Sequence, residues 1–426
     1  MDKIYVLICG FADVVAGGPI YYRNKVQYLE ERGWKVVVIP TNKGEKVLVR
    51  GMERFLGPYV PFILDIPSEY NKRQQKKLVD FLESFVPQHR GETIIETGTD
   101  YTNYWGEALA QRIRAKHIVV FLDEQNERID GDVIDFYKFK YSRREMACIS
   151  KPVMHNLFLP YENIPLDRCY SLICNCTNSL EDYETPLTKG IEKSRYNIGY
   201  VGRLEKPFMF QIIDGFLQFA TKHSEESITI VFFGGAFEYK TVRILEEQFK
   251  PFPNVKLHIT GYIYPLPVKA LQKMDVFVSG AGSATVAAKA GCLSVRIDVL
   301  DYKPIGIIQD LKQQKYEKCP NGDTVFDYLD WVLSGCSSVK PLLPDFANDW
   351  SVVCENFDKH MEFINESSNS KRYFDVSRLG VSKLRKKKKF IRSIIGLKAY
   401  DALHGSGLYR FVWNRLHHFQ ADEVQV

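Results

Sequence analysis

The chain has 426 residues, of which 45% are hydrophobic and 26% are charged. This length predicts two or three domains, and the composition excludes an intrinsically disordered protein. Nine scattered cysteines favour a reducing cytoplasm over a disulfide framework. The closest pair, Cys174 and Cys176, has no second pair at a suitable spacing, so we predict no metal site. Because no run of about 18 apolar residues occurs, we expect no membrane-spanning helix.

Short β-branched or aromatic runs alternate with helical periods along the chain, which is typical of βαβ units. The first run is interrupted by Gly10 and Asp13, which indicates a buried strand rather than a signal peptide. Residues 177–194 are polar and contain Pro186 and Gly190, so we expect a linker there. Before this linker we predict strands at residues 4–8, 36–39, 93–96, 117–122, 147–149 and 170–173, and helices at 19–32, 73–85, 105–115 and 133–141.

A second alternating series follows the linker, which indicates two Rossmann-like halves in tandem within an α/β protein. Two further helices after this series would close the fold. The predicted strands are residues 196–201, 228–232, 255–259, 275–278 and 293–297, and the predicted helices are 208–222, 239–249, 267–273, 285–290, 324–333 and 350–363.

Gly17, Gly18 and Pro19 lie between the first predicted strand and its helix. Two glycines allow the backbone to approach a ligand closely, and proline is favoured in the first helical turn. A plain strand-to-helix turn would have the same composition. The motif is not the G-x-G-x-x-G fingerprint, so a nicotinamide-dependent enzyme is disfavoured.

Arg203 and Lys206 follow the strand at residues 196–201, at the expected carboxyl edge of a parallel sheet. A guanidinium binds phosphate oxygens bidentately and an ammonium adds a point charge, so the pair predicts a diphosphate site. The alternative is two solvated cations near a helix start. The positive end of the helix dipole disfavours that alternative and favours an anionic ligand.

Gly280, Gly282, Ser283 and Thr285 follow the strand at residues 275–278 and precede another helix. Small residues and hydroxyls at a helix N-terminus suit a phosphate or a ribose. Ser283 could instead simply cap the helix. Together with Arg203, the motif favours the nucleotide site.

Asp123 and Glu124 follow the strand at residues 117–122, at the edge that faces the expected cleft. A carboxylate there could accept a proton from an acceptor hydroxyl, although acidic residues after strands are common. Asp13, Glu96 and Asp100 are rivals on the same argument, and Asp298 and Asp301 are candidates for contacting a sugar hydroxyl.

The basic charge is concentrated at the C-terminus. The whole chain has a net charge of +5, but residues 371–426 hold 13 Lys and Arg against 4 Asp and Glu. Seven of the ten residues 383–392 are basic, and Tyr409, Phe411 and Trp413 follow them. This combination predicts contact with an anionic membrane, or else a solvated tail. No nucleic-acid recognition motif accompanies it.

At these motifs, over residues 1–365, the sequence resembles the GT-B glycosyltransferases, especially the retaining enzymes that build bacterial surface polysaccharides. Gly17-Gly18 is similar to the N-terminal glycine loop of that family, and residues 147–151 resemble its strand-Ser turn before a short helix. Asn175 is similar to the NG turn that closes the first domain. Residues 202–204 match the "GRL" element, whose Arg and following Lys bind the donor diphosphate in the family.

The sequence departs from that pattern at two places. The family's Lys comes five residues after its Arg, whereas Lys206 comes three residues after Arg203. The Glu-x7-Glu pair of many members is missing. Residues 279–291 instead resemble the glycine-rich donor loop of the MurG-like and plant-type relatives, with Ala288 in place of the Glu that holds the ribose. The resemblance therefore leaves the stereochemical outcome open.

The resemblance implies a GT-B fold of two tandem Rossmann-like domains facing a cleft. An acceptor domain would span residues 1–180 and a nucleotide-sugar donor domain residues 195–345. A closing or crossover helix would follow at 346–370, and then a basic amphipathic C-terminal tail at 371–426.

The implied activity is that of a hexosyltransferase in surface polysaccharide biosynthesis. It would move a sugar from a nucleotide-diphosphate sugar to a glycan or lipid-linked acceptor, with no tightly bound cofactor and no nucleic-acid partner. Such a protein would be cytoplasmic, with residues 383–415 on the inner face of the membrane. Two alternatives stay open: a sugar-nucleotide epimerase of the same fold, and a catalytically degenerate GT-B binding subunit.

Overall fold

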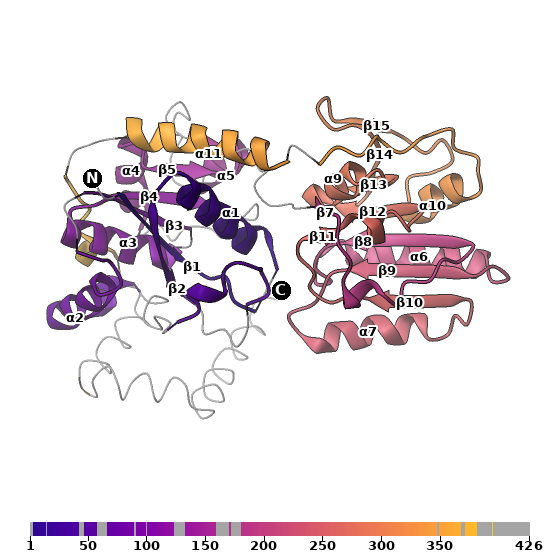
Figure 1. The fold of residues 1–426 in the computed structure, drawn as a ribbon, viewed down its shortest axis with the longest axis horizontal. Helices are drawn as coiled ribbons and strands as arrows, with labels where there is room; N and C mark the ends of the chain where they lie inside the picture. The colour runs from indigo at the N-terminus through magenta and orange to yellow at the C-terminus, as the bar shows by residue number, and fades with distance from the viewer. Residues whose placement is uncertain are drawn as a thin grey trace, which may run out of the picture.

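The computed structural model describes residues 3–13, 15–41, 47–57, 66–88, 91–98, 100–122, 133–158, 170–171, 180–346, 349–367, 371–380 and 394. These residues form two α/β units, one in each half of the chain and each built on a largely parallel sheet, and Figure 1 shows the two units side by side. We call them the N-terminal unit and the C-terminal unit. Among the described residues, no helix combines the length and the hydropathy needed to cross a bilayer.

The N-terminal unit contains a six-stranded parallel sheet in the order β2-β1-β3-β4-β5-β6, with helices on both faces. Its strands are β1 (Lys3–Cys9), β2 (Lys35–Pro40), β3 (Glu92–Thr97), β4 (Lys116–Phe121), β5 (Met146–Cys148) and β6 (Tyr170–Ser171). Its helices are α1 (Gly17–Glu31), α2 (Lys72–Glu83), α3 (Asp100–Ile113), α4 (Ile134–Ser142) and α5 (Lys151–Phe158), with 3-10 turns η1 (Glu53–Phe55), η3 (Pro67–Glu69) and η6 (Val376–Arg378).

The C-terminal unit contains a seven-stranded sheet in the order β10-β9-β8-β12-β13-β14-β15, whose last two strands run antiparallel to their neighbours. Its strands are β8 (Tyr196–Val201), β9 (Ile228–Phe233), β10 (Val255–Ile259), β12 (Val276–Gly280), β13 (Ser294–Ile297), β14 (Pro304–Asp310) and β15 (Lys315–Glu317). Its helices are α6 (Met209–Lys222), α7 (Tyr239–Phe249), α8 (Val268–Leu271), α9 (Ala281–Lys289) and α10 (Val325–Leu333).

Burial on both faces explains why the parallel strands are almost wholly apolar. In β1, Tyr5 and Leu7 pack into one hydrophobic cluster. The alternate residues Ile4 and Val6 pack into another on the opposite face. Side chains of a strand alternate between faces, and a parallel sheet covered by helices on both sides requires apolar residues at every position.

The helix α11 (Asp349–Glu366) returns from the C-terminal unit and lies on the N-terminal unit, as the orange helix in Figure 1 shows. Its Asp358 carboxylate accepts a hydrogen bond from the Tyr28 hydroxyl at 2.6 Å and pairs with Arg32 at 3.0 Å. Its Phe357 and Ile364 side chains are part of the core cluster around β1. The last long helix therefore completes the first core.

Two expectations about local structure were wrong, and two strands were not predicted. The described part of the expected linker, residues 180–194, is not a plain linker, because β7 (Leu180–Glu181) pairs with β11 (Leu266–Pro267) and η5 (Pro186–Thr188) follows. The helix expected at 267–273 is reduced to α8, since β11 occupies its start. The antiparallel strands β14 and β15 were not predicted. All of these elements except β14 are at most four residues long, too short for a periodic signal.

Candidate functional site

The two motifs of the C-terminal unit lie next to each other at the carboxyl edge of its sheet. Strands β8 and β12 are parallel neighbours, and the Val201 backbone N–H donates a hydrogen bond to Ser279 Oγ at 3.0 Å. The ring of Phe208 lies 2.6 Å from the position that a Cβ on Gly280 would occupy. The turn that carries Arg203 and the turn that begins α9 are therefore in contact.

Close glycine packing fixes the turn before Arg203. Gly202 has φ +142°, a conformation that favours glycine, and a Cβ there would lie 2.7 Å from the Tyr200 hydroxyl oxygen. A Cβ on Gly234, after β9, would lie only 1.8 Å from the Gly202 carbonyl oxygen. The Tyr200 hydroxyl in turn donates a hydrogen bond to the Arg203 carbonyl at 2.8 Å. The position of Arg203 is thus set by backbone contacts with two strands.

The Arg203 guanidinium is partly buried and lies over the ring of Phe237, 5.2 Å from its centroid. No carboxylate of the described residues lies within ion-pair distance of it. Lys206 is exposed, and α6 begins three residues later, at Met209, so the cations lie in the turn and not in the helix. A guanidinium held in place over an aromatic ring without a counter-charge is suited to bind an anionic ligand.

The Gly280–Thr285 motif forms the start of α9. Gly280 occupies the N-cap position and no side chain caps the helix, so the interpretation of Ser283 as a cap is wrong. Gly282 is exposed, and Ser283 and Thr285 are partly buried in the first turns. The first turn of a helix presents backbone N–H donors and the positive end of the dipole, which together favour a phosphate.

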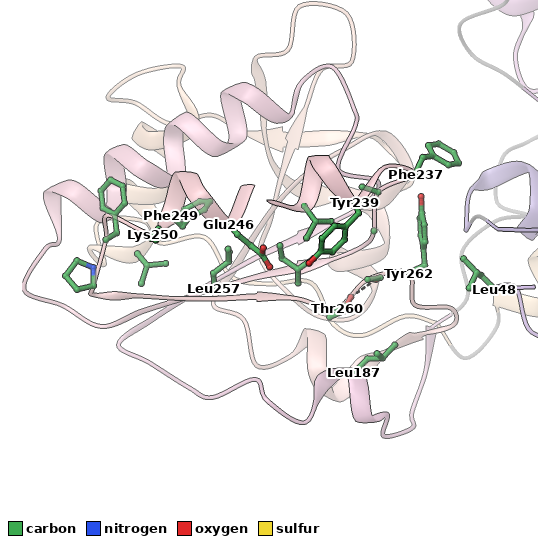
Figure 2. A pocket seen from close by; sticks show the side chains of 18 residues that line it. Leu48, Leu187, Phe237, Tyr239, Glu246, Phe249, Lys250, Leu257, Thr260 and Tyr262 are labelled. Carbon is green, nitrogen blue, oxygen red and sulfur yellow. Dashed lines mark hydrogen bonds between the residues drawn. The ribbon is translucent and has the colours of Figure 1, made fainter. Parts of the chain in front are cut away.

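A hollow of about 930 Å³ opens beside this edge, between α7 and the edge strand β10. Figure 2 shows Phe237 and Tyr262 at one end of it, together with Leu48 of the N-terminal unit. The Tyr262 hydroxyl is buried and has no hydrogen-bond partner among the described residues. Burial and the Glu205 carboxylate raise its pKa to about 12, against the opposing charge of Arg203. A buried polar group without a partner is costly, which indicates a ligand contact at this position.

Sequence reasoning missed Phe237 and Tyr262. Both follow glycines at the ends of strands, Gly234-Gly235 after β9 and Gly261 after β10. The same carboxyl-edge argument that singled out Arg203 applies to these turns, because β8, β9 and β10 are parallel neighbours. Glycine after an apolar strand was the signal that could have found them.

The catalytic candidates Asp123 and Glu124 lie outside the described residues, as do Asn175, Cys174 and Cys176. Asp100 is the first residue of α3, but its side chain is also outside the description. Where the structure is described, no group of three or more His, Cys, Asp or Glu is arranged to hold a metal ion. The roles of the two carboxylates therefore stay a prediction.

Glu96 is not an acid at an open edge, contrary to expectation. It is fully buried in β3, where it accepts hydrogen bonds from the Tyr5 and Tyr21 hydroxyls. The Lys25 ammonium lies 3.7 Å and His360 Nε2 3.4 Å from its Oε2 atom. Burial alone would raise its pKa, but Lys25 and the hydrogen bonds hold it at about 2. Glu96 is therefore a permanently charged part of the core.

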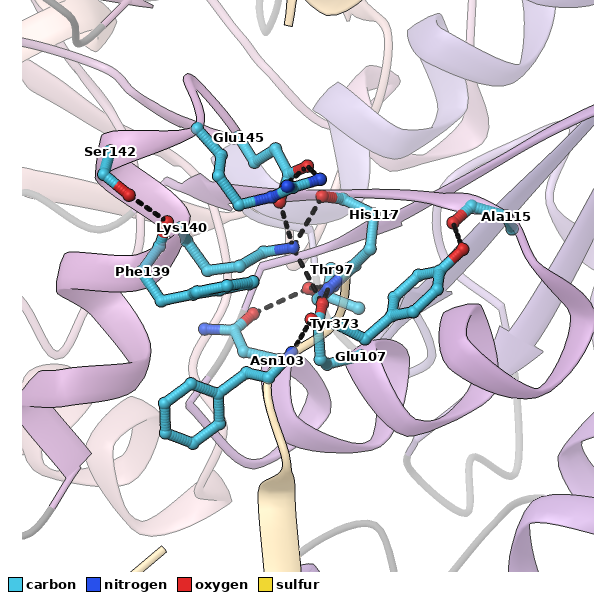
Figure 3. A network of polar contacts seen from close by, with 12 residues as sticks. Thr97, Asn103, Glu107, Ala115, His117, Phe139, Lys140, Ser142, Glu145 and Tyr373 are labelled. Atoms are coloured by element: carbon cyan, nitrogen blue, oxygen red, sulfur yellow. Dashed lines mark hydrogen bonds and ion pairs between the residues drawn. The ribbon is translucent and has the colours of Figure 1, made fainter. Parts of the chain in front are cut away.

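A second buried network, shown in Figure 3, surrounds Glu107 of α3. Its Oε2 atom lies 2.8 Å from Lys140 Nζ and 2.9 Å from His117 Nδ1, and Lys140 also pairs with Glu145 at 2.7 Å. Its Oε1 atom accepts a hydrogen bond from the Phe374 backbone N–H at 2.7 Å. All four charged or titratable residues are at most 3% exposed, so this network holds the fold together and is not a site.

The remaining acidic candidates with described side chains, Asp13, Asp298 and Asp301, lie in loops. Asp298 accepts a hydrogen bond from the Leu300 backbone N–H at 2.8 Å, and Asp301 accepts one from Lys303 at 2.9 Å. Asp13 has a left-handed backbone with φ 64° in the loop after β1. The carboxylates of Asp298 and Asp301 stabilise the loop after β13, and their contact with a sugar hydroxyl stays a prediction.

Gly17 and Gly18 form the first turn of α1, after β1 in the N-terminal unit. A Cβ on Gly18 would meet nothing within 4 Å, so no packing contact requires glycine there. Alanine is the better helix former by about 0.5–1 kcal/mol. The open space fits the predicted close approach of a ligand.

Gly18→Ala is therefore expected to keep or slightly raise the free energy of unfolding while it lowers turnover, because the new methyl group enters only the ligand's space. Chemical denaturation and a steady-state transfer assay on the same preparation measure both quantities. Unchanged turnover in a variant of normal stability would contradict the ligand role of this turn.

Comparison with known proteins defines the fold. No protein-family model and no curated protein matches the sequence. A glycosyltransferase from Rickettsia africae ESF-5 superposes with a TM-score of 0.54 at 13% identity, over 92% of this chain and 99% of that chain. Anabaena Alr3699/HepE, solved with UDP and glucose, has a TM-score of 0.46 at 13% identity, over 86% of this chain and 98% of that chain. UDP-GlcNAc 2-epimerase from Neisseria meningitidis has a TM-score of 0.42 at 13% identity, over 84% of this chain and 100% of that chain.

The chain has the GT-B fold, as the sequence predicted. The predicted basic tail at 371–426 lies outside the described residues, apart from residues 371–380 and 394. At 13% identity the likeness defines the architecture and not the reaction, so the reaction has to be argued from the site.

Proposed function

We propose that the protein is a nucleotide-sugar-dependent glycosyltransferase of the hexosyltransferase type. The observation that carries this proposal is the contact between the Arg203 turn and the start of α9, beside a hollow that contains the Tyr262 hydroxyl. The Arg203 turn and the start of α9 suit a diphosphate, and the hollow suits a nucleoside or a sugar. All of them lie at the carboxyl edge of a parallel sheet, where ligands of open α/β folds bind.

In the proposed reaction the donor diphosphate lies against Arg203, Lys206 and the first turn of α9. An acceptor hydroxyl oxygen bonds to the anomeric carbon as the bond from that carbon to the diphosphate breaks. The cations stabilise the negative charge that accumulates on the departing nucleoside diphosphate, and this contact strengthens in the transition state. The hydroxyl proton passes to Asp123 or Glu124, the candidate bases after β4.

The acceptor is proposed to be a glycan or a lipid-linked sugar of surface polysaccharide biosynthesis, approached from the N-terminal unit. The basic segment 383–415 supports this choice, because a cluster of cations with aromatic residues is attracted to anionic lipids. The enzyme would then work in the cytoplasm, on the inner face of the membrane.

A nucleotide panel tests the donor site. We expect one of UDP, GDP, dTDP and CMP to raise the Tm of the purified chain. A ligand at 100 times its dissociation constant stabilises the folded state by about 2.7 kcal/mol, which a thermal scan detects easily. Failure of all four nucleotides to shift Tm would contradict the proposal and favour a catalytically degenerate binding subunit.

The products then distinguish transfer from epimerisation. Incubation with the matching nucleotide sugar and no acceptor is expected to leave the sugar unchanged, apart from slow hydrolysis. Formation of an isomerised nucleotide sugar, detected by NMR, would replace the proposal with a sugar-nucleotide epimerase.

A further inference from the structure

Two arginines of the N-terminal unit, Arg23 and Arg50, belong to segments that meet at the carboxyl edge of its sheet. Arg23 is in the second turn of α1, which follows β1, and Arg50 is in the segment that follows β2. Strands β1 and β2 are parallel neighbours. The Arg23 Nε atom is 3.9 Å from the position that a Cβ on Gly51 would occupy, so the guanidinium lies against the residue next to Arg50.

Neither guanidinium has a carboxylate partner within the described part of the chain. Arg23 is partly buried, and its Nη1 atom donates a hydrogen bond to the side chain of the adjacent Asn24 at 2.9 Å. Two cations on neighbouring segments without a counter-charge are stabilised by an anion that reaches both of them. Five other arginines of this unit do pair: Arg32 with Asp358, Arg54 with Glu30, Arg112 with Asp80 and Glu83, Arg143 with Glu145, and Arg144 with Glu366.

The arginine pair faces the C-terminal unit. The Tyr264 hydroxyl, in the loop after β10, lies 3.5 Å from Asn24 Oδ1. Burial and the Glu181 carboxylate raise the pKa of Tyr183 against the opposing charge of Arg50, and the Tyr183 hydroxyl donates a hydrogen bond to the Pro265 carbonyl at 2.6 Å. Both units therefore contribute to the surroundings of the pair.

The same junction continues into the donor site. Leu48, two residues before Arg50, lines the hollow together with Phe237 and Tyr262. The Arg203 guanidinium lies over the ring of Phe237. The junction thus has Arg203 on its C-terminal side and the arginine pair on its N-terminal side. A ligand held by the pair would lie on the side from which an acceptor is expected to enter.

We propose that Arg23 and Arg50 bind a phosphate group carried by the acceptor. This inference rests on the proposed function, since it assigns the donor diphosphate to Arg203 and Lys206 and leaves the second set of cations for the other substrate. Two guanidiniums bind a phosphomonoester or diphosphate through charge-assisted, bidentate hydrogen bonds. Acceptors of this class are phosphorylated glycans and lipid diphosphate sugars.

The experiment uses the full-length protein saturated with the nucleotide that raises Tm in the panel. Inorganic pyrophosphate and geranyl diphosphate are then titrated in by calorimetry. The variant Arg23→Gln/Arg50→Gln is compared with Arg54→Gln, a matched control whose side chain is paired with Glu30 and 55% exposed. A charge-assisted hydrogen bond contributes about 1.5–3 kcal/mol, so its loss weakens binding by roughly 10-fold or more.

We expect the wild type and Arg54→Gln to bind pyrophosphate beside the nucleotide, and the double variant to bind it at least 10-fold more weakly with unchanged nucleotide affinity. Tighter binding of geranyl diphosphate than of pyrophosphate would assign a lipid-linked acceptor, and equal binding a phosphorylated glycan. The proposal is overturned if the saturated wild type binds neither probe, or if the double variant also loses nucleotide affinity.

These outcomes are distinct from failure of the proposed function. If the wild type binds no nucleotide, the donor assignment fails. Pyrophosphate titration of the nucleotide-free protein then still tests whether Arg23 and Arg50 bind an anion. Binding that depends on both arginines would then support an anion site without a glycosyl donor, and equal binding by wild type and double variant would overturn it.

Discussion

Arg203→Ala is expected to lower kcat/KM by about 100- to 1,000-fold and to weaken nucleotide binding at least 10-fold. The guanidinium lies over the ring of Phe237, and the Arg203 carbonyl accepts a hydrogen bond from the Tyr200 hydroxyl. Lys206 adds a point charge but not a bidentate contact, so it does not replace the guanidinium. Removing one preorganised donor that faces developing charge typically costs about 2.7–4 kcal/mol of transition-state stabilisation. Steady-state kinetics with the matching nucleotide sugar and a nucleotide titration measure the two effects.

Two variants make this result specific. Arg243→Ala removes an exposed arginine of α7 and is expected to leave both quantities unchanged. Arg203→Lys keeps a charge but loses the bidentate geometry, so an intermediate loss is expected. If Arg203→Ala retained wild-type turnover and nucleotide affinity, the diphosphate would have to bind elsewhere and the proposed function would lose its main support.

Glu96→Gln is expected to lower the free energy of unfolding by about 3–5 kcal/mol, because it leaves the buried Lys25 ammonium without its counter-charge. Lys25 is fully buried, and its Nζ atom lies within 6 Å of the ring centroids of Tyr5, Tyr28 and Phe357, which do not replace a carboxylate. Urea unfolding measures the change.

The exposed pair Glu192–Lys256, at 2.7 Å, provides the control for this substitution. Glu192→Gln removes a carboxylate from an ion pair that lies in solvent, so it is expected to change stability by less than about 1 kcal/mol. Equal stability of Glu96→Gln and Glu192→Gln would show that the buried charge is not required.

The same buried groups make stability depend on pH in one direction. Burial and Lys25 lower the pKa of His360 to about 4, and burial and Lys140 lower that of His117 to about 4. The unfolded chain therefore takes up more protons below the ordinary histidine pKa of about 6.5, and stability falls from there to about pH 4. Glu96 and Glu107, with folded pKa values of about 2, extend the loss from about pH 4.5 down to pH 2. Glu96→Gln should flatten this last part of the curve.

Much of the fold and part of the candidate site could be predicted from the sequence, because local pattern and sheet topology determine them. Apolar strands with helical periods between them gave the two sheets, and parallel pairing alone implied that Arg203 and Gly280 share an edge. The first residues of helices and the short strands were predicted less accurately, because few residues define them. β14 begins with Pro304 and includes Gly306, which conceal its strand character.

The environment of Glu96 could not be predicted, because it depends on contacts between distant parts of the chain. Its position after an apolar run resembles an edge carboxylate, but His360, 264 residues away in sequence, covers it. The sequence likewise suggests that Lys25 is an exposed helix residue, because its buried partner Glu96 is distant in sequence. Tyr262 was also missed, since an isolated aromatic residue after a strand is usually core, and only the hollow beside it distinguishes the two.

The return of α11 to the first sheet has a consequence for how the protein forms during translation. The N-terminal unit needs Phe357, His360 and Ile364 to complete its interior, and these residues leave the ribosome after the whole C-terminal unit has been synthesised. The C-terminal unit can therefore reach its native state first. Until α11 packs onto the sheet, the nascent chain exposes the apolar face of α1 and the Lys25 side chain. We therefore expect chaperones to bind the nascent N-terminal half.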